Sequence, residues 1–184
     1  MKNYYLLICL VVVALSCKRD VCDCSAEVSE AVAKYEHYEI ASSGRFIFEG
    51  LQVFDLDLGN KQYLKDIVGG GRLVIRFSEL NCQDCVNSMA EMIRKFFDVK
   101  KDRILILGSY QSNRTFQLYL NKLGLENYEA YNIAEGALND YIDHDNVPYA
   151  FLLNNDMRID NLLIPDFRLA KVTQDYFEII ANRF

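Results

Sequence analysis

Two cysteines that directly follow an apolar segment constrain this chain most. Cys82 and Cys85 are separated by two residues, and residues 73–77 before them have the apolar, partly β-branched pattern of a buried strand. Residues 83–97 place apolar side chains at helical spacing, so the pair is expected at the first turn of an amphipathic helix. Backbone N–H groups at a helix start are unpaired and carry about half a positive charge, which stabilises a thiolate at Cys82. Strand, cysteine pair and helix in this order predict an α/β unit with a reactive thiol.

The rest of the chain continues the alternation of strands and helices. We expect one domain over residues 45–184, because 184 residues allow one domain with a short extension and no linker interrupts this range. A turn-forming cluster at residues 154–156 predicts an antiparallel hairpin of the strands on either side. Extended segments are expected over residues 45–58, 104–107, 128–133, 148–153 and 159–164, helices over 113–123 (closed by Gly124) and 173–184, and a short helix or loop over 61–68.

The first seventeen residues have the pattern of an export signal. Lys2 precedes an uninterrupted apolar run over residues 6–15, about half the length that a membrane-spanning helix needs. The run ends in Ala14-Leu15-Ser16-Cys17, which resembles the lipobox of bacterial lipoproteins. We expect a signal peptide over 1–16, a lipid on Cys17 and a tether over 17–44 with a helix at 25–38; an uncleaved N-terminal anchor is the alternative. In both cases the domain is expected in the cell envelope, anchored to a bacterial membrane outside the cytoplasm, on the periplasmic side or at the surface.

Export would allow the remaining thiols to persist as disulfides, which a reducing cytoplasm normally prevents. These thiols form two close pairs, Cys22 with Cys24 in the tether and Cys82 with Cys85 in the body. We expect Cys82 to attack a disulfide and Cys85, on the same helix face, to resolve the mixed disulfide. A structural disulfide that clips the helix start and a metal site are the alternatives. The spacing of Cys22 and Cys24 strains an intramolecular disulfide, so we expect incidental thiols there, with a relay to the body pair as the alternative.

Composition argues against several other functions. The net charge of −6 argues against a nucleic-acid binder, which needs clustered lysine and arginine. The sequence contains no Ser-His-Asp arrangement, phosphate-binding glycine loop or dinucleotide fingerprint. With only 2 histidines the chain offers few metal ligands, and the spacing of Cys22 and Cys24 is too short for a zinc knuckle. We therefore expect no metal and no cofactor, and a copper-handling protein with His144 as an added ligand is the alternative.

Several stretches of the sequence resemble the thioredoxin-like superfamily, and within it the membrane-tethered branch typified by TlpA and ResA proteins. They are residues 53–61 with 64–66, the strand 73–77 that leads into Cys82 and Cys85, and residues 146–149. The resemblance implies a thioredoxin-like α/β fold, with a central mixed β-sheet flanked by helices and an insertion between Cys82 and Pro148. It also implies that Pro148 is cis, faces the cysteine pair and, with Val147, binds the substrate segment. The implied function is that of a thiol-disulfide oxidoreductase that reduces disulfides of exported proteins and draws electrons from a membrane donor.

The sequence departs from the superfamily pattern at three positions in or near the pair. Asn81 stands where a tryptophan usually precedes the first cysteine, and Asp84 stands where proline is common. The carboxylate of Asp84 complements the helix dipole but disfavours a thiolate at Cys82, so its two effects are opposed. Arg76 occupies the strand position of a buried acid, and we expect Glu79 to replace that acid as proton shuttle, with a solvated loop acid as the alternative.

Two rival functions use the same sequence features. In a non-catalytic lipoprotein the fold would be a binding or assembly module, and the Cys82–Cys85 disulfide would be structural. In a metallochaperone the pair would bind copper. A catalyst needs an exposed Cys82 of low pKa, a clip needs a stable disulfide, and a chaperone needs tight metal binding.

Overall fold

The computed structural model describes residues 44–47, 49–138, 143, 146–166 and 169–184, together with Ser29 and Ala33. The chain divides into two compact units, Met1–Glu36 and His37–Phe184, and the fold below belongs to the second. The expected signal peptide 1–16, the lipidation site Cys17, the Cys22–Cys24 pair and the tether helix 25–38 lie outside the described residues, except that Ser29 and Ala33 are helical. Within the described part of the chain, no helix is both long and apolar enough to cross a membrane.

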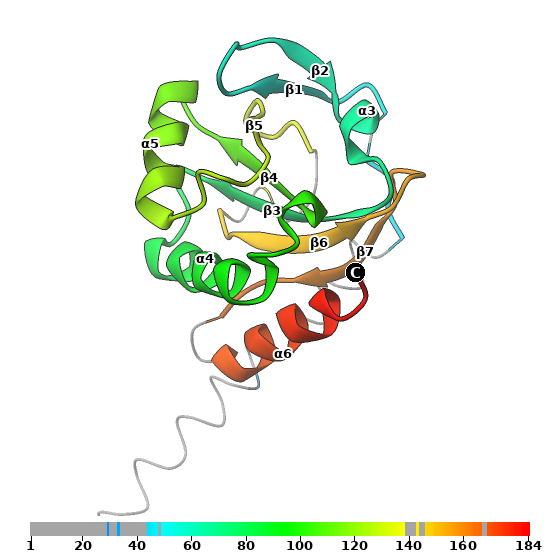
Figure 1. Cartoon of the computed structure of the whole chain (residues 1–184), viewed down its shortest axis with the longest axis vertical. Helices are drawn as coiled ribbons and strands as arrows, with labels where there is room; N and C mark the ends of the chain where they lie inside the picture. The colour runs from blue at the N-terminus through cyan, green and yellow to red at the C-terminus, as the bar shows by residue number, and fades with distance from the viewer. Residues whose placement is uncertain are drawn as a thin grey trace, which may run out of the picture. The chain divides into compact units, whose positions relative to one another are not determined.

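The described residues form one mixed sheet of seven strands (Figure 1). The strands are β1 (Gln52–Asp55), β2 (Lys61–Tyr63), β3 (Arg72–Ser78), β4 (Ile104–Ser109), β5 (Ala130–Asn132), β6 (Tyr149–Leu153) and β7 (Ile159–Leu163). Their order across the sheet is β2-β1-β5-β4-β3-β6-β7. Strands β3, β4 and β5 are parallel, and the remaining pairings are antiparallel. The antiparallel β6–β7 pair confirms the hairpin expected around residues 154–156.

Helices α4 (Gln83–Phe97) and α5 (Asn113–Leu123) follow the parallel strands β3 and β4, as the alternation in the sequence predicts. Two further helices, α3 (Leu64–Val68) and α6 (Ala170–Ala181), follow β2 and β7, and a 3-10 turn lies at Lys101–Arg103. The predicted bounds of α4 and α5 are confirmed. The Ser112 hydroxyl caps the start of α5 by accepting the N–H of Thr115 at 3.1 Å, and Gly124 ends the helix in the left-handed conformation, with φ 68°.

The segment before β3 differs from the expectation. Extended structure was expected over residues 45–58, but β1 ends at Asp55. The Asp55 carboxylate accepts the N–H groups of Asp57 and Leu58 at 2.9 and 2.8 Å, which closes a turn and leaves the Leu58 side chain 77% exposed. The chain then returns as β2, so the piece expected as a short helix or loop is a strand followed by α3.

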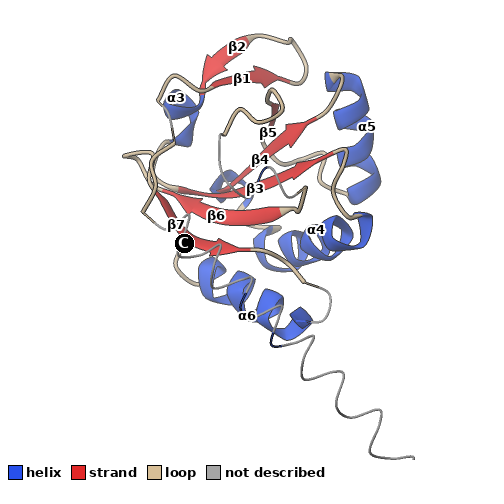
Figure 2. Ribbon diagram, turned by 180° about the vertical axis from the view of Figure 1, so that it is seen from behind, coloured by secondary structure: helices blue, strands red, loops and turns tan. Residues whose placement is uncertain are grey.

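Alternating side chains of β3 reach the two faces of the sheet. Val74 packs on one face in a core that includes side chains of β1, α3, β4 and β6. Phe77 points to the other face, where its ring meets that of Phe116 from α5, with centroids 5.8 Å apart. Helix α6 lies beside α4, as Figures 1 and 2 both show, and the rings of Phe97 and Phe177 join them at 6.5 Å.

The parallel strands bring three loops to one edge of the sheet. Because β3, β4 and β5 run in the same direction, their carboxyl ends lie together. The turn that leads to Cys82 leaves β3 there, the loop before α5 leaves β4, and the chain after Asn132 leaves β5. This edge is the place where a thiol at the start of α4 meets residues distant in sequence.

Candidate active site

The cysteine pair lies at the first turn of α4, as the sequence predicts. Cys82 is the N-cap residue, and its carbonyl accepts the N–H of Val86 at 3.1 Å. The side chain of Cys82 is exposed, that of Cys85 is partly buried, and both are free thiols in this structure. The sulfur atom of a substrate therefore reaches the Cys82 thiol more easily than the Cys85 thiol.

The surroundings of Cys82 favour its thiolate. The thiol of Cys85 donates a hydrogen bond to it, and this is the largest cause that lowers the pKa of Cys82. The sulfur makes no close capping hydrogen bond, but the backbone N–H groups of Cys85 and Asp84 also lower the pKa. The Asp84 carboxylate raises it, so the opposed effects expected of this residue are both present, and the pKa of Cys82 is lowered on balance.

Cys85 has the opposite electrostatics. Burial is the main cause that raises the pKa of Cys85 to about 12, followed by the hydrogen bond that it donates to Cys82. The carboxylates of Asp166 and Asp84 raise it further. One thiol is therefore prepared to attack while the other keeps its proton, which is the division of labour that a thiol-disulfide exchange needs.

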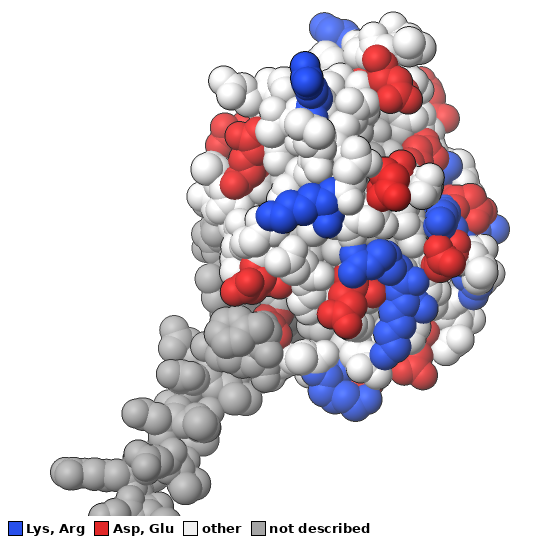
Figure 3. Space-filling view, turned by 60° about the vertical axis from the view of Figure 1, so that its left-hand side comes forward, with Lys and Arg blue, Asp and Glu red and all other residues white. Residues whose placement is uncertain are grey.

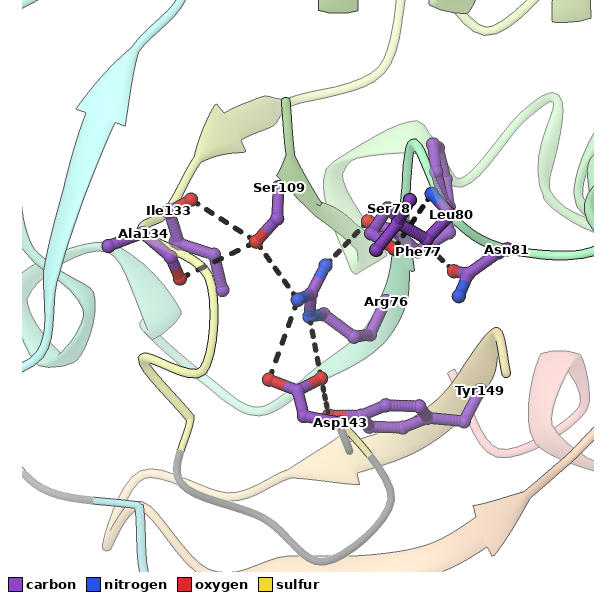
Figure 4. A network of polar contacts seen from close by, with 10 residues as sticks. All are labelled: Arg76, Phe77, Ser78, Leu80, Asn81, Ser109, Ile133, Ala134, Asp143 and Tyr149. Carbon is purple, nitrogen blue, oxygen red and sulfur yellow. Dashed lines mark hydrogen bonds and ion pairs between the residues drawn. The ribbon is translucent and has the colours of Figure 1, made fainter. Parts of the chain in front are cut away.

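The turn between β3 and the pair carries Asn81 where the superfamily usually has a tryptophan. The Asn81 side chain accepts the N–H of Ser78 at 2.7 Å and so folds back onto the turn, as Figure 4 shows. The N–H of Leu80 donates to the Ser78 hydroxyl at 3.3 Å, and the Leu80 side chain is left 64% exposed. The exposed apolar side chain next to the pair is thus Leu80, one position before the usual tryptophan.

Arg76, which stands at the strand position where the superfamily has a buried acid, is itself buried and paired with a carboxylate. Its Nε atom lies 3.0 Å from Oδ1 of Asp143, and both side chains are 4% exposed. The guanidinium also donates to the Ser109 hydroxyl at 3.0 Å and to the Phe77 carbonyl at 2.5 Å (Figure 4). The Tyr149 hydroxyl donates to the same Asp143 oxygen at 2.9 Å. Asp143 is a site residue that sequence reasoning missed, and no local pattern points to it because 67 residues separate it from Arg76.

The expected proton shuttle has a structural partner. Glu79 lies in the exposed turn after β3, and its Oε1 atom accepts the N–H of Gln111 at 2.9 Å, which joins this turn to the loop after β4. The carboxylates that shift the pKa values of the two thiols are instead those of Asp84 and Asp166. Sequence reasoning missed Asp166, which follows β7 and reaches the pair only through the fold. A proton-shuttle role for Glu79 stays a prediction.

The Val147–Pro148 segment enters β6, but its peptide bond is not as expected. Pro148 is buried and Val147 packs at the margin of the core. The described residues contain no cis peptide bond, so the expectation that Pro148 is cis is wrong. Asn146, two residues before Pro148, has a left-handed backbone with φ 52°, a conformation that asparagine tolerates. Binding of a substrate segment by Val147 and Pro148 stays a prediction.

Metal ligands do not gather in the described part of the chain. No group of three or more histidine, cysteine, aspartate or glutamate side chains is placed there to hold an ion. His144, on which the copper alternative depends, lies outside the described residues.

Comparison with known proteins identifies the fold. No model of a protein family and no curated protein matches the sequence. Among solved structures, a thiol:disulfide interchange protein from Bacteroides sp. matches with a TM-score of 0.53 at 15% identity, over 74% of this chain and 90% of that one. The thioredoxin domain of a thiol-disulfide oxidoreductase from Bacteroides vulgatus matches with a TM-score of 0.53 at 13% identity, over 74% and 98% of the two chains. A secreted disulfide oxidoreductase from Mycobacterium tuberculosis matches with a TM-score of 0.52 at 14% identity, over 73% and 96%.

The chain therefore has a thioredoxin-like fold, as the sequence predicts. In the order of the chain, α5 and β5 stand between β4 and Pro148, in the range where an insertion was expected. At these identities the likeness is one of fold alone.

Proposed function

We propose that this protein is a membrane-anchored, extracytoplasmic thiol-disulfide oxidoreductase that reduces disulfides of exported proteins through Cys82 and Cys85. One observation carries the proposal. At the start of α4, an exposed thiol of lowered pKa accepts a hydrogen bond from a partly buried thiol whose pKa is raised to about 12. A structural clip has no need for such an asymmetry.

The exchange proceeds in two balanced steps. The Cys82 thiolate attacks one sulfur of a substrate disulfide, forms a mixed disulfide and releases the other substrate sulfur as a thiolate, which takes a proton. Cys85 then loses its proton and attacks the Cys82 sulfur, which forms the Cys82–Cys85 disulfide and releases the second substrate sulfur as a thiolate that takes up a proton in turn. Two electrons pass to the substrate, and a dithiol donor at the membrane must reduce the pair before the next cycle.

The burial of Cys85 supports this order of events. While its pKa is about 12, Cys85 does not compete for the incoming disulfide. Once Cys82 is in a mixed disulfide, it no longer carries the charge that disfavours ionisation of Cys85, so Cys85 becomes easier to deprotonate. The second step therefore becomes favourable only after the first.

The proposed location of the protein in the cell envelope rests on the sequence alone. The pattern around Cys17 supports a lipid anchor on the outer side of a bacterial membrane, with exported proteins as partners. Labelling of cells with a fatty acid analogue should mark the wild-type chain and leave Cys17→Ser unmarked. On the face shown in Figure 3, basic side chains are interspersed with acidic ones, which favours protein partners over nucleic acid.

The test of the chemistry uses the full chain in detergent, reduced beforehand. Wild type should reduce hydroxyethyl disulfide, Cys82→Ser should be inactive, and Cys85→Ser should accumulate mixed disulfides with exported proteins that mass spectrometry identifies. An unreactive Cys82, with no adducts in Cys85→Ser, would favour the binding or assembly module in which the pair is a clip.

A further inference from the structure

A hollow lies beside the turn that carries Cys82. It has a volume of about 380 Å³ and is formed where the carboxyl ends of β3, β4 and β5 meet. The apolar residues of its lining are Leu80, Tyr110, Ile133 and Ala134. Two consecutive peptide units span at most about 7 Å, so the Cα atoms of Leu80 and Cys82 are no further apart than this. The hollow is within reach of a chain whose cysteine reacts with Cys82.

The walls of the hollow are fixed in place. The Ser109 hydroxyl accepts a hydrogen bond from the Arg76 guanidinium and donates one to the Ile133 carbonyl at 3.2 Å. In the view of Figure 4, Ser109 lies between Ile133 and Leu80. The Tyr110 ring stacks on Phe116 with centroids 4.7 Å apart and an interplanar angle of 7°. A preformed apolar site binds without the cost of ordering its walls.

Leu80 is exposed for a local reason. Because Asn81 and Ser78 use their polar groups to close the turn, Leu80 is the side chain that the turn presents outward. Other apolar side chains such as Leu58 are also exposed, which is ordinary for a protein surface. Leu80 differs because it lines a hollow and lies two residues from a reactive thiol.

The rim of the hollow is acidic. Glu79 and Glu135 belong to its lining, and none of its lining residues is basic. The Gln111 N–H holds the Glu79 carboxylate at the rim. Asp84 adds a third carboxylate close to Cys82, whereas the nearby guanidinium of Arg76 is neutralised by Asp143. A bound segment therefore gains from an apolar side chain in the hollow and a cationic one at the rim.

We propose that this hollow selects the substrate of the exchange, an inference that rests on the proposed function. Its occupant is an extended segment of an exported protein with an apolar side chain such as leucine within two residues of the attacked cysteine and a lysine or arginine beyond it. Leu80 contacts the apolar side chain, and Glu79 and Glu135 attract the cation. The hollow therefore directs Cys82 toward particular disulfides among those exposed in the envelope.

The probes are short synthetic peptides with one cysteine as a mixed disulfide with thionitrobenzoate, whose release is coloured. The cysteine is flanked symmetrically, with leucine next to it and arginine outside, so that the direction of binding does not matter. One comparison peptide replaces both leucines with serine, and another replaces both arginines with glutamate. The full reduced chain in detergent is used, and each result is a ratio of rates, because a ratio cancels a general change in the reactivity of Cys82.

Wild type should react about tenfold faster with the leucine peptide than with the serine peptide, and Leu80→Ser should bring this ratio close to one. Leu58→Ser removes an equally large exposed side chain from the β1–β2 turn and should keep the ratio. Glu135→Gln should reduce the preference for arginine over glutamate about threefold, an effect that salt weakens, whereas Glu178→Gln on α6 should not.

The outcomes separate this inference from the proposed function. If wild type reduces hydroxyethyl disulfide but shows no preference for the leucine peptide, or if Leu80→Ser keeps that preference, the hollow does not select substrates and the oxidoreductase stands. If wild type does not reduce hydroxyethyl disulfide, the oxidoreductase fails, and the substrate hollow fails with it.

Discussion

Replacing Asp143 with alanine should destabilise the protein by about 4 kcal/mol, because among the described residues Arg76 then stays charged and buried with no other carboxylate in ion-pair contact. The two side chains are each 4% exposed, and the guanidinium faces the carboxylate with both Nε and Nη2, at 3.0 and 3.4 Å. Their other partners among the described residues are neutral, namely the Ser109 hydroxyl, the Phe77 carbonyl and the Tyr149 hydroxyl.

The expected loss of stability depends on which charges stay buried in each variant. Removing one partner of a buried ion pair costs about 3–5 kcal/mol, since the other partner keeps the desolvation penalty of its charge. In Asp143→Ala the Tyr149 hydroxyl also loses its hydrogen bond to the carboxylate, so a value near the middle of this range is expected. The double variant Arg76→Met/Asp143→Leu removes both charges and keeps much of the volume, so it should lie within about 1.5 kcal/mol of wild type.

The measurement is urea unfolding followed by circular dichroism. The chain has no tryptophan, and its 12 tyrosines report on many places at once, so backbone ellipticity is the more direct probe. All samples are kept reduced, because a Cys82–Cys85 disulfide would change the unfolded state. In thermal unfolding the same loss should lower the Tm of Asp143→Ala by about 12 °C, since 1 kcal/mol corresponds to about 2–4 °C for a chain of this size.

The double variant distinguishes a buried ion pair from simple packing. If Asp143→Ala loses less than about 1 kcal/mol, the pair is not desolvated in solution and the reasoning is refuted. If the double variant loses as much as the single one, side-chain packing rather than the uncompensated charge explains the cost.

Two further predictions concern the thiols and the core. Cys85→Ala removes the hydrogen bond that stabilises the thiolate and should raise the pKa of Cys82, whereas Asp84→Asn removes a negative charge and should lower that pKa. The pH dependence of iodoacetamide alkylation measures both shifts. Shifts of the Cys82 pKa in the same direction would contradict these assigned causes. Gly108→Ala places a methyl group against the ring of Phe116 in a filled core and should cost about 2 kcal/mol in urea unfolding. A second substitution, Phe116→Leu, makes room for that methyl group, so Gly108→Ala should cost less in that background than in wild type.

Much of the fold could be predicted from the sequence, because its signals are local. Helical spacing from Gln83 to Phe97 fixes α4, and Ser112 and Gly124 set the two ends of α5 through their own capping chemistry. The prediction of extended structure up to residue 58 was wrong, because two local signals compete there. The apolar pattern that continues to Leu58 suggested a longer strand, but the Asp55 carboxylate closes a turn there.

By itself, the sequence determined the strand–cysteine–helix unit, the order of elements and hence a thioredoxin-like fold with Cys82 ahead of Cys85. Periodicity, capping and turn formation act over a few residues, so they can be read along the chain. Tertiary structure alone decided that Asp143 neutralises Arg76, that Asp166 acts on Cys85, and that three strand ends enclose a hollow beside Leu80. It also decided that the Val147–Pro148 peptide is trans. These features depend on the packing of segments that are distant in sequence, and such packing leaves no periodic pattern along the chain.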